Sequence, residues 1–248
     1  MANIIVECAK YLMIILITMY TYECFTVFGY ADGDKKRRIL RNQNKLMFMI
    51  HFLAFAGMYF KIGEIKILIF YAVQVVLLLA IILLYTWIYP KASRLVVNNM
   101  CMLMSVGFIM IARLNYDKCV KQFVIAVLGT VIMFLVPWLI KSVKSFRNFG
   151  WIYCVAGLVL LCAVLLGNKV YGANLTLSIG AFSVQPAEFV KILYVMFVAS
   201  MFNKSTTFKQ TCIVTVFAAL HVIILVLSTD LGAALIFFVV YIACLLYT

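Results

Sequence analysis

The sequence predicts an all-α fold, a polytopic bundle of about nine transmembrane helices. Of the 248 residues, 67% are hydrophobic and only 12% are charged, and the mean hydropathy is +1.13. A soluble domain of this length could not cover so much apolar surface, whereas a membrane protein exposes it to lipid. The apolar residues also fall into long runs separated by short basic segments, so we expect the chain to cross the membrane repeatedly.

The nine apolar runs lie at roughly 11–30, 46–60, 67–89, 95–113, 122–140, 149–167, 185–203, 210–228 and 231–248. The second run is short for a bilayer core that needs about 20 residues. The N-terminus carries Glu7 and lacks a small-residue cleavage site, so we interpret the first run as a retained span and not as a signal peptide. The last run reaches Thr248 without a polar tail, and we therefore expect a longer protein of which this chain is the N-terminal part.

The distribution of Lys and Arg predicts the orientation. We interpret residues 33–45 as a first loop, and its basic residues are Lys35, Lys36, Arg37, Arg38, Arg41 and Lys45. If this loop is cytoplasmic, the N-terminus lies outside, and the predicted inside loops carry more basic residues than the outside ones, as membrane proteins prefer. The alternative for this segment is recognition of anionic lipid head groups. The net charge of +13 does not indicate nucleic acid, because the basic residues separate apolar runs and form no single patch.

Neither the cysteines nor the histidines predict a metal site or a disulfide framework. The eight cysteines form no CxxC pair and nearly all lie in apolar runs, where free Cys behaves as a small hydrophobe. His51 and His221 lie in separate runs, so we expect each to make a hydrogen bond that supports helix packing.

The segment 172–191, GANLTLSIGAFSVQPAEFVK, carries the candidate site. Gln185 and Pro186 end a Gly-rich loop and a helix should follow, with Glu188 and Lys191 three residues apart on one face. A charge at the centre of a membrane helix costs about 2.5–3.5 kcal/mol on insertion scales, so such residues are usually functional or paired. A helix N-terminus beside an amine suits a phosphate or diphosphate. The alternative is that the pair only fixes packing between spans.

Two further residues are candidates for the same cavity. Arg113, at the outer end of the fourth run, is a candidate phosphate partner, although an interfacial Arg that extends to the water layer is commoner. Asp230, between the eighth and ninth runs, is a candidate that on its own is better explained as the cap of the ninth helix.

The order of these features resembles the SEDS family (shape, elongation, division and sporulation), which includes FtsW, RodA and SpoVE. That family has a loop GARRWI-x-LG-xxxx-QPSE-xx-K and a later QPDLGTA. The matching positions here are Gly172-Ala173, Gly180, Gln185-Pro186-Ala187-Glu188 and Lys191, then Asp230-Leu231-Gly232-Ala233-Ala234, and upstream Gly107 to Arg113 followed by Lys121-Gln122. The resemblance covers about 97–248. It implies the first six spans of a ten-span core over 96–248, preceded by a three-span extension over 1–95.

The resemblance implies peptidoglycan glycosyltransfer in the bacterial plasma membrane, for elongation, division or sporulation. The substrate would be lipid II, the leaving group undecaprenyl diphosphate, and the partner a class B penicillin-binding transpeptidase. The cavity candidates would be Gln185, Glu188, Lys191, Arg113 and Asp230, and a divalent cation is the cofactor that such chemistry allows. No catalytic residue is assigned in this chain, because the family's proposed base lies in an external loop that would follow Thr248. We therefore expect the 248 residues alone to be inactive.

The sequence departs from the family pattern at two places. Asn174, Leu175 and Thr176 stand where the family has Arg-Arg-Trp, and Ser228-Thr229 replace the Gln-Pro before Asp230. Two alternatives therefore stay open: a transporter or flippase of a lipid-linked anion, and a non-catalytic membrane scaffold that recruits cell-wall enzymes. A transporter of this kind would be expected to contain inverted repeats, and none is evident.

Overall fold

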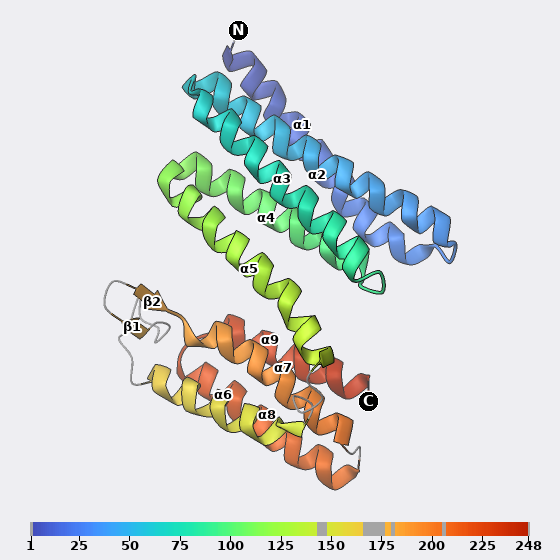
Figure 1. Ribbon diagram of the computed structural model, residues 1–248, viewed down its shortest axis with the longest axis vertical. Coiled ribbons are helices and arrows are strands. Elements are labelled where there is room, and N and C mark those ends of the chain that lie inside the picture. Colours follow the sequence, from blue (N-terminus) through green and yellow to red (C-terminus); the bar gives the residue numbers. More distant parts are fainter. Residues whose placement is uncertain (1, 143–147, 166–176, 180–181, 205–206, 248) are drawn as a thin grey trace. The chain divides into compact units, whose positions relative to one another are not determined.

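The structure is a computed structural model, which describes residues 2–142, 148–165, 177–179, 182–204 and 207–247. Within these residues it contains nine helices and one hairpin of two short strands (Figure 1). The elements are α1 (Ala2–Gly29), α2 (Gly33–Ile62), α3 (Ile65–Ile88), α4 (Arg94–Leu114), α5 (Tyr116–Ser142), α6 (Gly150–Leu165), β1 (Leu177–Ile179), β2 (Phe182–Val184), α7 (Pro186–Lys204), α8 (Phe208–Leu227) and α9 (Leu231–Leu246). Each predicted apolar run overlaps one of the nine helices, and the all-α prediction is confirmed.

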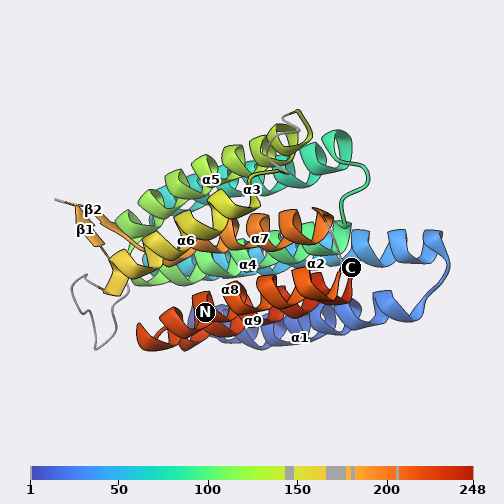
Figure 2. The same cartoon turned by 90° about the horizontal axis from the view of Figure 1, so that it is seen from below.

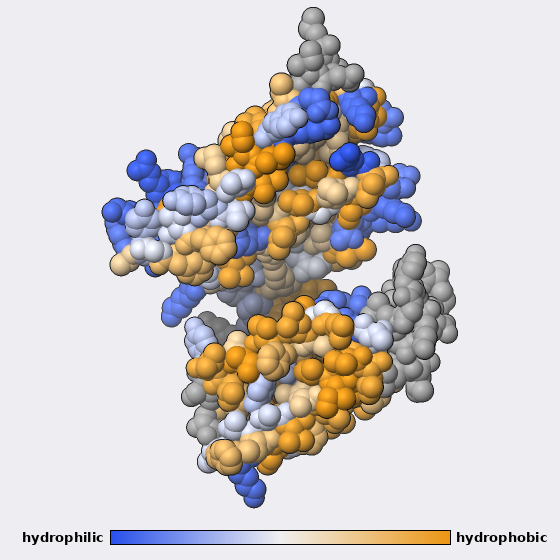
Figure 3. Space-filling view, turned by 180° about the vertical axis from the view of Figure 1, so that it is seen from behind, coloured by the Kyte–Doolittle hydropathy of each residue, from blue (hydrophilic) through white to orange (hydrophobic). Residues whose placement is uncertain are grey.

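The helices have the length and composition of membrane spans. Within the described residues, seven helices are long and apolar enough to cross a bilayer: α1 to α5, α7 and α8. The helices α6 and α9 are apolar but shorter. Large apolar side chains such as Trp87, Leu114 and Phe208 are more than 80% exposed, which suits a lipid-facing surface. Figure 3 shows hydrophilic residues gathered toward the ends of the α1–α4 helices, with apolar surface between them. The chain is a multi-pass membrane protein.

The prediction of a loop over residues 33–45 is wrong, because these residues form the start of α2. Asp32 caps this helix by accepting from the backbone N–H of Asp34, and the Lys, Arg, Leu and Gln residues that follow are good helix formers. At 1.5 Å per residue, the 30 residues of α2 span about 45 Å, more than the bilayer core of about 30 Å. The basic turns therefore extend the helix beyond the apolar segment. The second run looked short because it is only the C-terminal part of a long helix.

The chain divides into two compact units, Met1–Leu135 and Val136–Thr248. The division falls within α5, next to Pro137, which lies inside that helix. Proline removes a backbone hydrogen bond and commonly kinks a helix at such a position. This division by packing differs from the predicted boundary at residue 95, which follows the family resemblance and stays a prediction.

Unit 1 is held together by apolar packing and by polar contacts inside the bundle. α1 and α2 form a helical hairpin (Figures 1 and 2), and α2 packs against both α3 and α4. The Asn98 side chain of α4 donates to the Leu40 carbonyl at 2.9 Å and to Gln43 Oε1 at 3.1 Å. Further along the same two helices, Ser105 Oγ lies 2.8 Å from His51 Nδ1. α2 and α4 therefore run parallel, and hydrogen bonds of this kind tie helices together where no water competes.

Unit 2 packs α6 to α9 around a cluster of buried rings. Tyr194 and Phe197 of α7 surround His221 of α8 together with Phe237 of α9, and the Tyr194 and Phe237 ring centroids are 4.4 Å apart. Gly157 of α6 lies against this cluster, where a Cβ atom would come within 2.8 Å of His221 Nε2. The absence of a side chain at residue 157 thus lets α6 approach α8 closely, as small residues do between membrane helices.

We expect Gly157→Ala to destabilise unit 2 by about 1–3 kcal/mol, because the His221 ring is fully buried among aromatic side chains and cannot move away easily. The measurement is the thermal unfolding midpoint of the purified chain in detergent. Gly129→Ala is the matched control, since nothing lies within 4 Å of a Cβ atom at that position in α5. Equal midpoints for the two variants would contradict the close approach.

Candidate functional site

The candidate site begins where a strand hairpin leads into α7. β1 and β2 pair antiparallel, with Ser178 opposite Ser183, and β2 ends at Val184 directly before Gln185. α7 begins at Pro186, which confirms the predicted start, and the Glu188 N–H donates to the Gln185 carbonyl at 3.2 Å. Pro suits the first helical position because its missing N–H would have no intrahelical partner there. Glu188 consequently lies in the first turn, at the positive end of the helix dipole.

Glu188 and Lys191 form an ion pair within α7. Lys191 Nζ lies 2.7 Å from Glu188 Oε1, and the exposed fractions of the two side chains are 27% and 57%. Both partners belong to the same helix and lie one turn apart, so this contact joins no two helices to each other. The carboxylate takes up one donor position of the amine and leaves the others for further acceptors.

The ion pair lies outside the packed side of α7. Val190, Tyr194 and Phe197 point into the buried core of unit 2, whereas Phe189 and Ile192 beside the pair are more than half exposed. The charged pair thus lies beside exposed apolar side chains of α7 and outside the packed core of unit 2. Packing of α7 against α6, α8 and α9 does not depend on it.

Asp230 lies at the corresponding end of α9. Its carboxylate accepts from the Ala233 N–H at 3.0 Å and caps the helix, so the cap interpretation is confirmed. The ring contacts Tyr194–Phe237 and Phe202–Tyr241 advance in the same direction along α7 and α9. The two helices therefore run parallel, and Glu188, Lys191 and Asp230 share one end of unit 2.

Arg113 belongs to unit 1. It lies exposed in the last turn of α4, where it lines a cavity of about 670 Å³ together with Lys10 and Lys61. Lys191 belongs to unit 2, and the role of Arg113 as a phosphate partner stays a prediction.

His51 makes the expected hydrogen bond between helices, whereas the hydrogen bond of His221 stays within its own helix. His51 Nδ1 bonds to Ser105 on α4, and His221 Nδ1 lies 2.8 Å from the Phe217 carbonyl of its own helix. Within the residues that the structure describes, no group of three or more His, Cys, Asp or Glu side chains could hold a metal ion. Glu188 is paired with an amine, so the candidate site as it stands does not fit a divalent cation.

Most of the buried polar side chains were not predicted from the sequence. Gln43, Gln74 and Asn98 are at most 3% exposed, and the Tyr194 hydroxyl and His221 Nε2 are buried without a hydrogen-bond partner among the described residues. A polar face on α4 was predictable from the sequence, because Asn98 and Ser105 are seven residues apart in an apolar run and so lie on one helix face.

Comparison with known proteins identifies the family. The sequence matches the family model for FtsW, RodA and SpoVE, described as cell cycle proteins, over residues 87–248, which is more than half of the chain. The chain belongs to the FtsW/RodA/SpoVE family. No solved structure matches it.

Individual relatives are distant. The peptidoglycan glycosyltransferase RodA of Mycobacterium leprae is 27% identical over 122 residues, which cover 45% of this chain and 26% of the relative. RodA of Mycobacterium tuberculosis is 27% identical over 126 residues, with 45% and 27% covered. FtsW of Neisseria gonorrhoeae is 26% identical over 68 residues, with 27% and 15% covered. The chain thus matches about a quarter or less of the length of these curated relatives.

The FtsW/RodA/SpoVE match includes all of α7 and the Asp230 turn, but one departure there changes the backbone. Thr229 has φ 61°, a left-handed conformation that a β-branched residue rarely adopts. The family pattern has Pro at this position, and Pro is fixed near φ −65°. The turn before Asp230 therefore cannot follow the backbone of the QPDLG pattern, although the Asp cap that follows it is kept.

We expect Asp230→Ala to lower stability by about 0.5–2 kcal/mol through loss of the cap, and Asp230→Asn to retain most of it, because Asn also caps helices well. Thermal unfolding of the purified chain measures both variants. A midpoint for Asp230→Ala equal to that of the unchanged chain would show that the cap contributes nothing to α9.

Proposed function

We propose that this chain works as part of a SEDS-type peptidoglycan glycosyltransferase that polymerises lipid II in the bacterial plasma membrane, together with the remaining spans of the ten-span core. Membership of the FtsW/RodA/SpoVE family and the glycosyltransferase names of its RodA relatives support this reaction. The observation that carries the proposal is the Glu188–Lys191 pair in the first turns of α7, outside the packed core of unit 2.

In the proposed reaction, a sugar hydroxyl of the acceptor attacks the anomeric carbon of the donor. A glycosidic C–O bond forms while the bond to the diphosphate breaks, and undecaprenyl diphosphate leaves with the negative charge. A carboxylate outside this chain takes the hydroxyl proton. In this chain, Glu188 and Lys191 would stabilise the negative charge that develops on the diphosphate.

Lys191 is suited to that task by its position. Its ammonium group lies within two turns of the N-terminus of α7, where the helix dipole also favours an anion. Glu188 holds the ammonium group in place at 2.7 Å and acts as a positioning residue. Gln185 directly precedes the helix, and Asp230 caps the start of α9 at the same end of unit 2.

The proposed orientation follows the charges. We place the basic start of α2 in the cytoplasm and the N-terminus outside, so that the start of α7 opens toward the outer leaflet, where lipid II is consumed. With this orientation the end of α4, which carries Arg113, would face the outside as well. The partner that this function requires is a class B penicillin-binding transpeptidase, which cross-links the glycan product.

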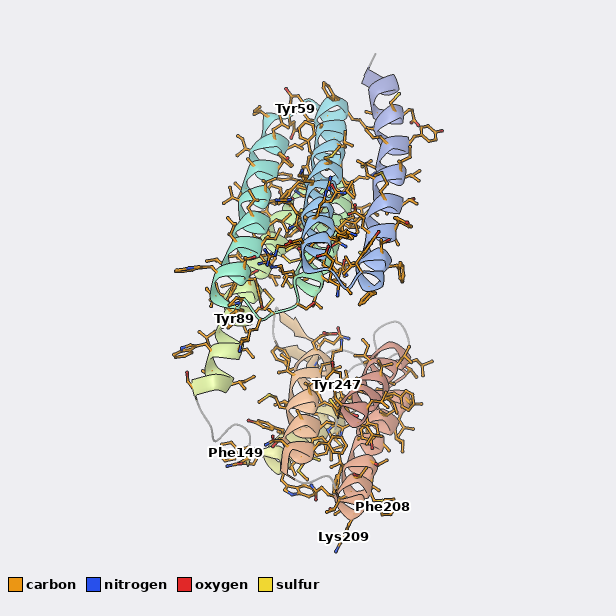
Figure 4. The ribbon with its side chains drawn as sticks, turned by 90° about the vertical axis from the view of Figure 1, so that its right-hand side faces the viewer. Tyr59, Tyr89, Phe149, Phe208, Lys209 and Tyr247 are labelled. Carbon is orange, nitrogen blue, oxygen red and sulfur yellow. The ribbon has the colours of Figure 1, made fainter. Side chains whose placement is uncertain are left out.

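We expect Lys191→Met to lower the rate of lipid II polymerisation by about 10²-fold, the usual effect of removing one preorganised group that stabilises transition-state charge. Lys191→Arg should retain more of the rate because it keeps the positive charge. Glycan products of the complete assembly, separated on a gel, measure each rate. Lys209→Met is the matched control, since Lys209 is an exposed lysine at the start of α8, at the opposite end of unit 2 (Figure 4).

If the chain is a scaffold or a transporter, Lys191→Met should leave lipid II polymerisation unchanged. A Lys191→Met protein that polymerises lipid II at the rate of the Lys209→Met control would refute the proposed role of Lys191. A loss of rate accompanied by an equal loss of thermal stability would assign Lys191 a structural role instead.

A further inference from the structure

A cavity lies at the basic end of unit 1. The starts of α2 and α4 and the end of α3 enclose about 210 Å³. Its lining includes the side chains of Arg37, Arg41, Asn44, Tyr85, Tyr89 and Arg94. Tyr89 follows α3 at this end of the unit, and Tyr59 marks the opposite end (Figure 4). Most of this lining precedes residue 87, where the family match begins.

Three guanidinium groups reach this cavity with little compensating negative charge. Arg37 and Arg41 are four residues apart on α2 and so lie on one face, and Arg94 is the first residue of α4. Arg37 lies 4.0 Å from Asp34, but both side chains are more than 70% exposed, so this ion pair is weak. Over the described part of the chain, neither Arg41 nor Arg94 has a carboxylate within 4.0 Å.

The backbone of α4 adds to the same preference for an anion. Ser93 precedes this helix but makes no side-chain capping hydrogen bond, so it leaves the first N–H groups of the helix available. A helix N-terminus with uncapped N–H groups attracts phosphate, and Arg binds phosphate with two parallel hydrogen bonds. The start of α4 and three Arg side chains thus together favour an anionic ligand such as a phosphate.

Asn44 and the size of the cavity narrow the chemistry of that ligand. Asn44 lines the cavity, and its buried Oδ1 has no hydrogen-bond partner within the described residues; a rotation of this side chain toward the cavity would let Oδ1 accept from a ligand hydroxyl. A volume of about 210 Å³ is below the usual 300–1,000 Å³ of a site for a drug-sized ligand, so a small ligand group fits it better than a nucleotide or a disaccharide. A phosphate group with a small hydroxylated substituent fits.

The aromatic side chains indicate the depth of the cavity. The Tyr85 and Tyr89 rings have centroids 5.7 Å apart, and the Tyr89 hydroxyl donates to the Phe134 carbonyl at 2.6 Å. Tyrosines of this kind gather at the level of the lipid head groups. The apolar part of α2 begins just after Asn44, which places the arginines at the same level.

We propose that this cavity binds a phosphate group that carries a small hydroxylated substituent, such as glycerol phosphate. The phosphate comes either from the head group of an anionic phospholipid or from a soluble phosphate ester. This site is independent of the proposed glycosyltransfer, because it uses none of the residues at the start of α7.

Native mass spectrometry of the purified chain in detergent tests the proposal, with phosphatidylglycerol, phosphatidylcholine and glycerol 3-phosphate as separate probes. We expect one retained phosphatidylglycerol and at least tenfold weaker retention in the double variant Arg41→Gln/Arg94→Gln. The matched control is Arg38→Gln/Lys45→Gln, which removes the same charge outside the cavity lining and should retain the lipid. Retention of glycerol 3-phosphate without the lipid would assign the site to a soluble ester.

Asn44→Leu is the second variant, which keeps every charge and should also weaken retention if the cavity is the site. It protects the test against a double variant that fails to fold, and a thermal unfolding curve identifies that case. Equal loss in the two double variants would overturn the proposal in favour of diffuse surface charge. The proposal would also be overturned if neither phosphatidylglycerol nor glycerol 3-phosphate bound. Equal retention of phosphatidylcholine and phosphatidylglycerol would overturn it as well.

Discussion

The ion pair of Glu188 and Lys191 is the constraint on which the functional account depends. Two charges in a helix that otherwise carries apolar residues are costly in a bilayer, and they are tolerated where they are paired and face a polar region. The pair lies at the N-terminus of α7, joins no second helix and lies beside exposed apolar side chains. A pair in this position adds nothing to the packing between helices, and the proposed function assigns it a role toward a ligand.

Unit 1 shows the contrasting use of polar groups. Asn98, Gln43 and the His51–Ser105 contact are buried between α2 and α4 and bond to each other or to the backbone, which aligns two parallel helices. The aligned starts of α2 and α4 then bring Arg37, Arg41 and Arg94 to one end of the unit. Buried neutral groups thus fix the bundle, and charged groups at the helix ends stay available.

Most of the fold was predictable from the sequence, because apolar runs of span length have few alternatives in a membrane. The helix start at Pro186, the first-turn position of Glu188 and the cap by Asp230 followed from local rules. The start of α2 was missed because charge was taken as the sign of a loop, although Lys, Arg and Gln favour helix. The contact of Gly157 with His221 and the left-handed Thr229 depend on tertiary packing, which residue spacing does not reveal.

The most direct test of the account is to exchange the two charges in Glu188→Lys/Lys191→Glu. The exchange preserves an ion pair of the same spacing, and only the position of the cation relative to the helix start changes. The account predicts a folded protein whose rate of lipid II polymerisation falls at least as far as in the Lys191→Met variant. The reason is that a carboxylate at residue 191 replaces the ammonium group that would contact the phosphate. Polymerisation at the original rate would show that the two charges serve only each other.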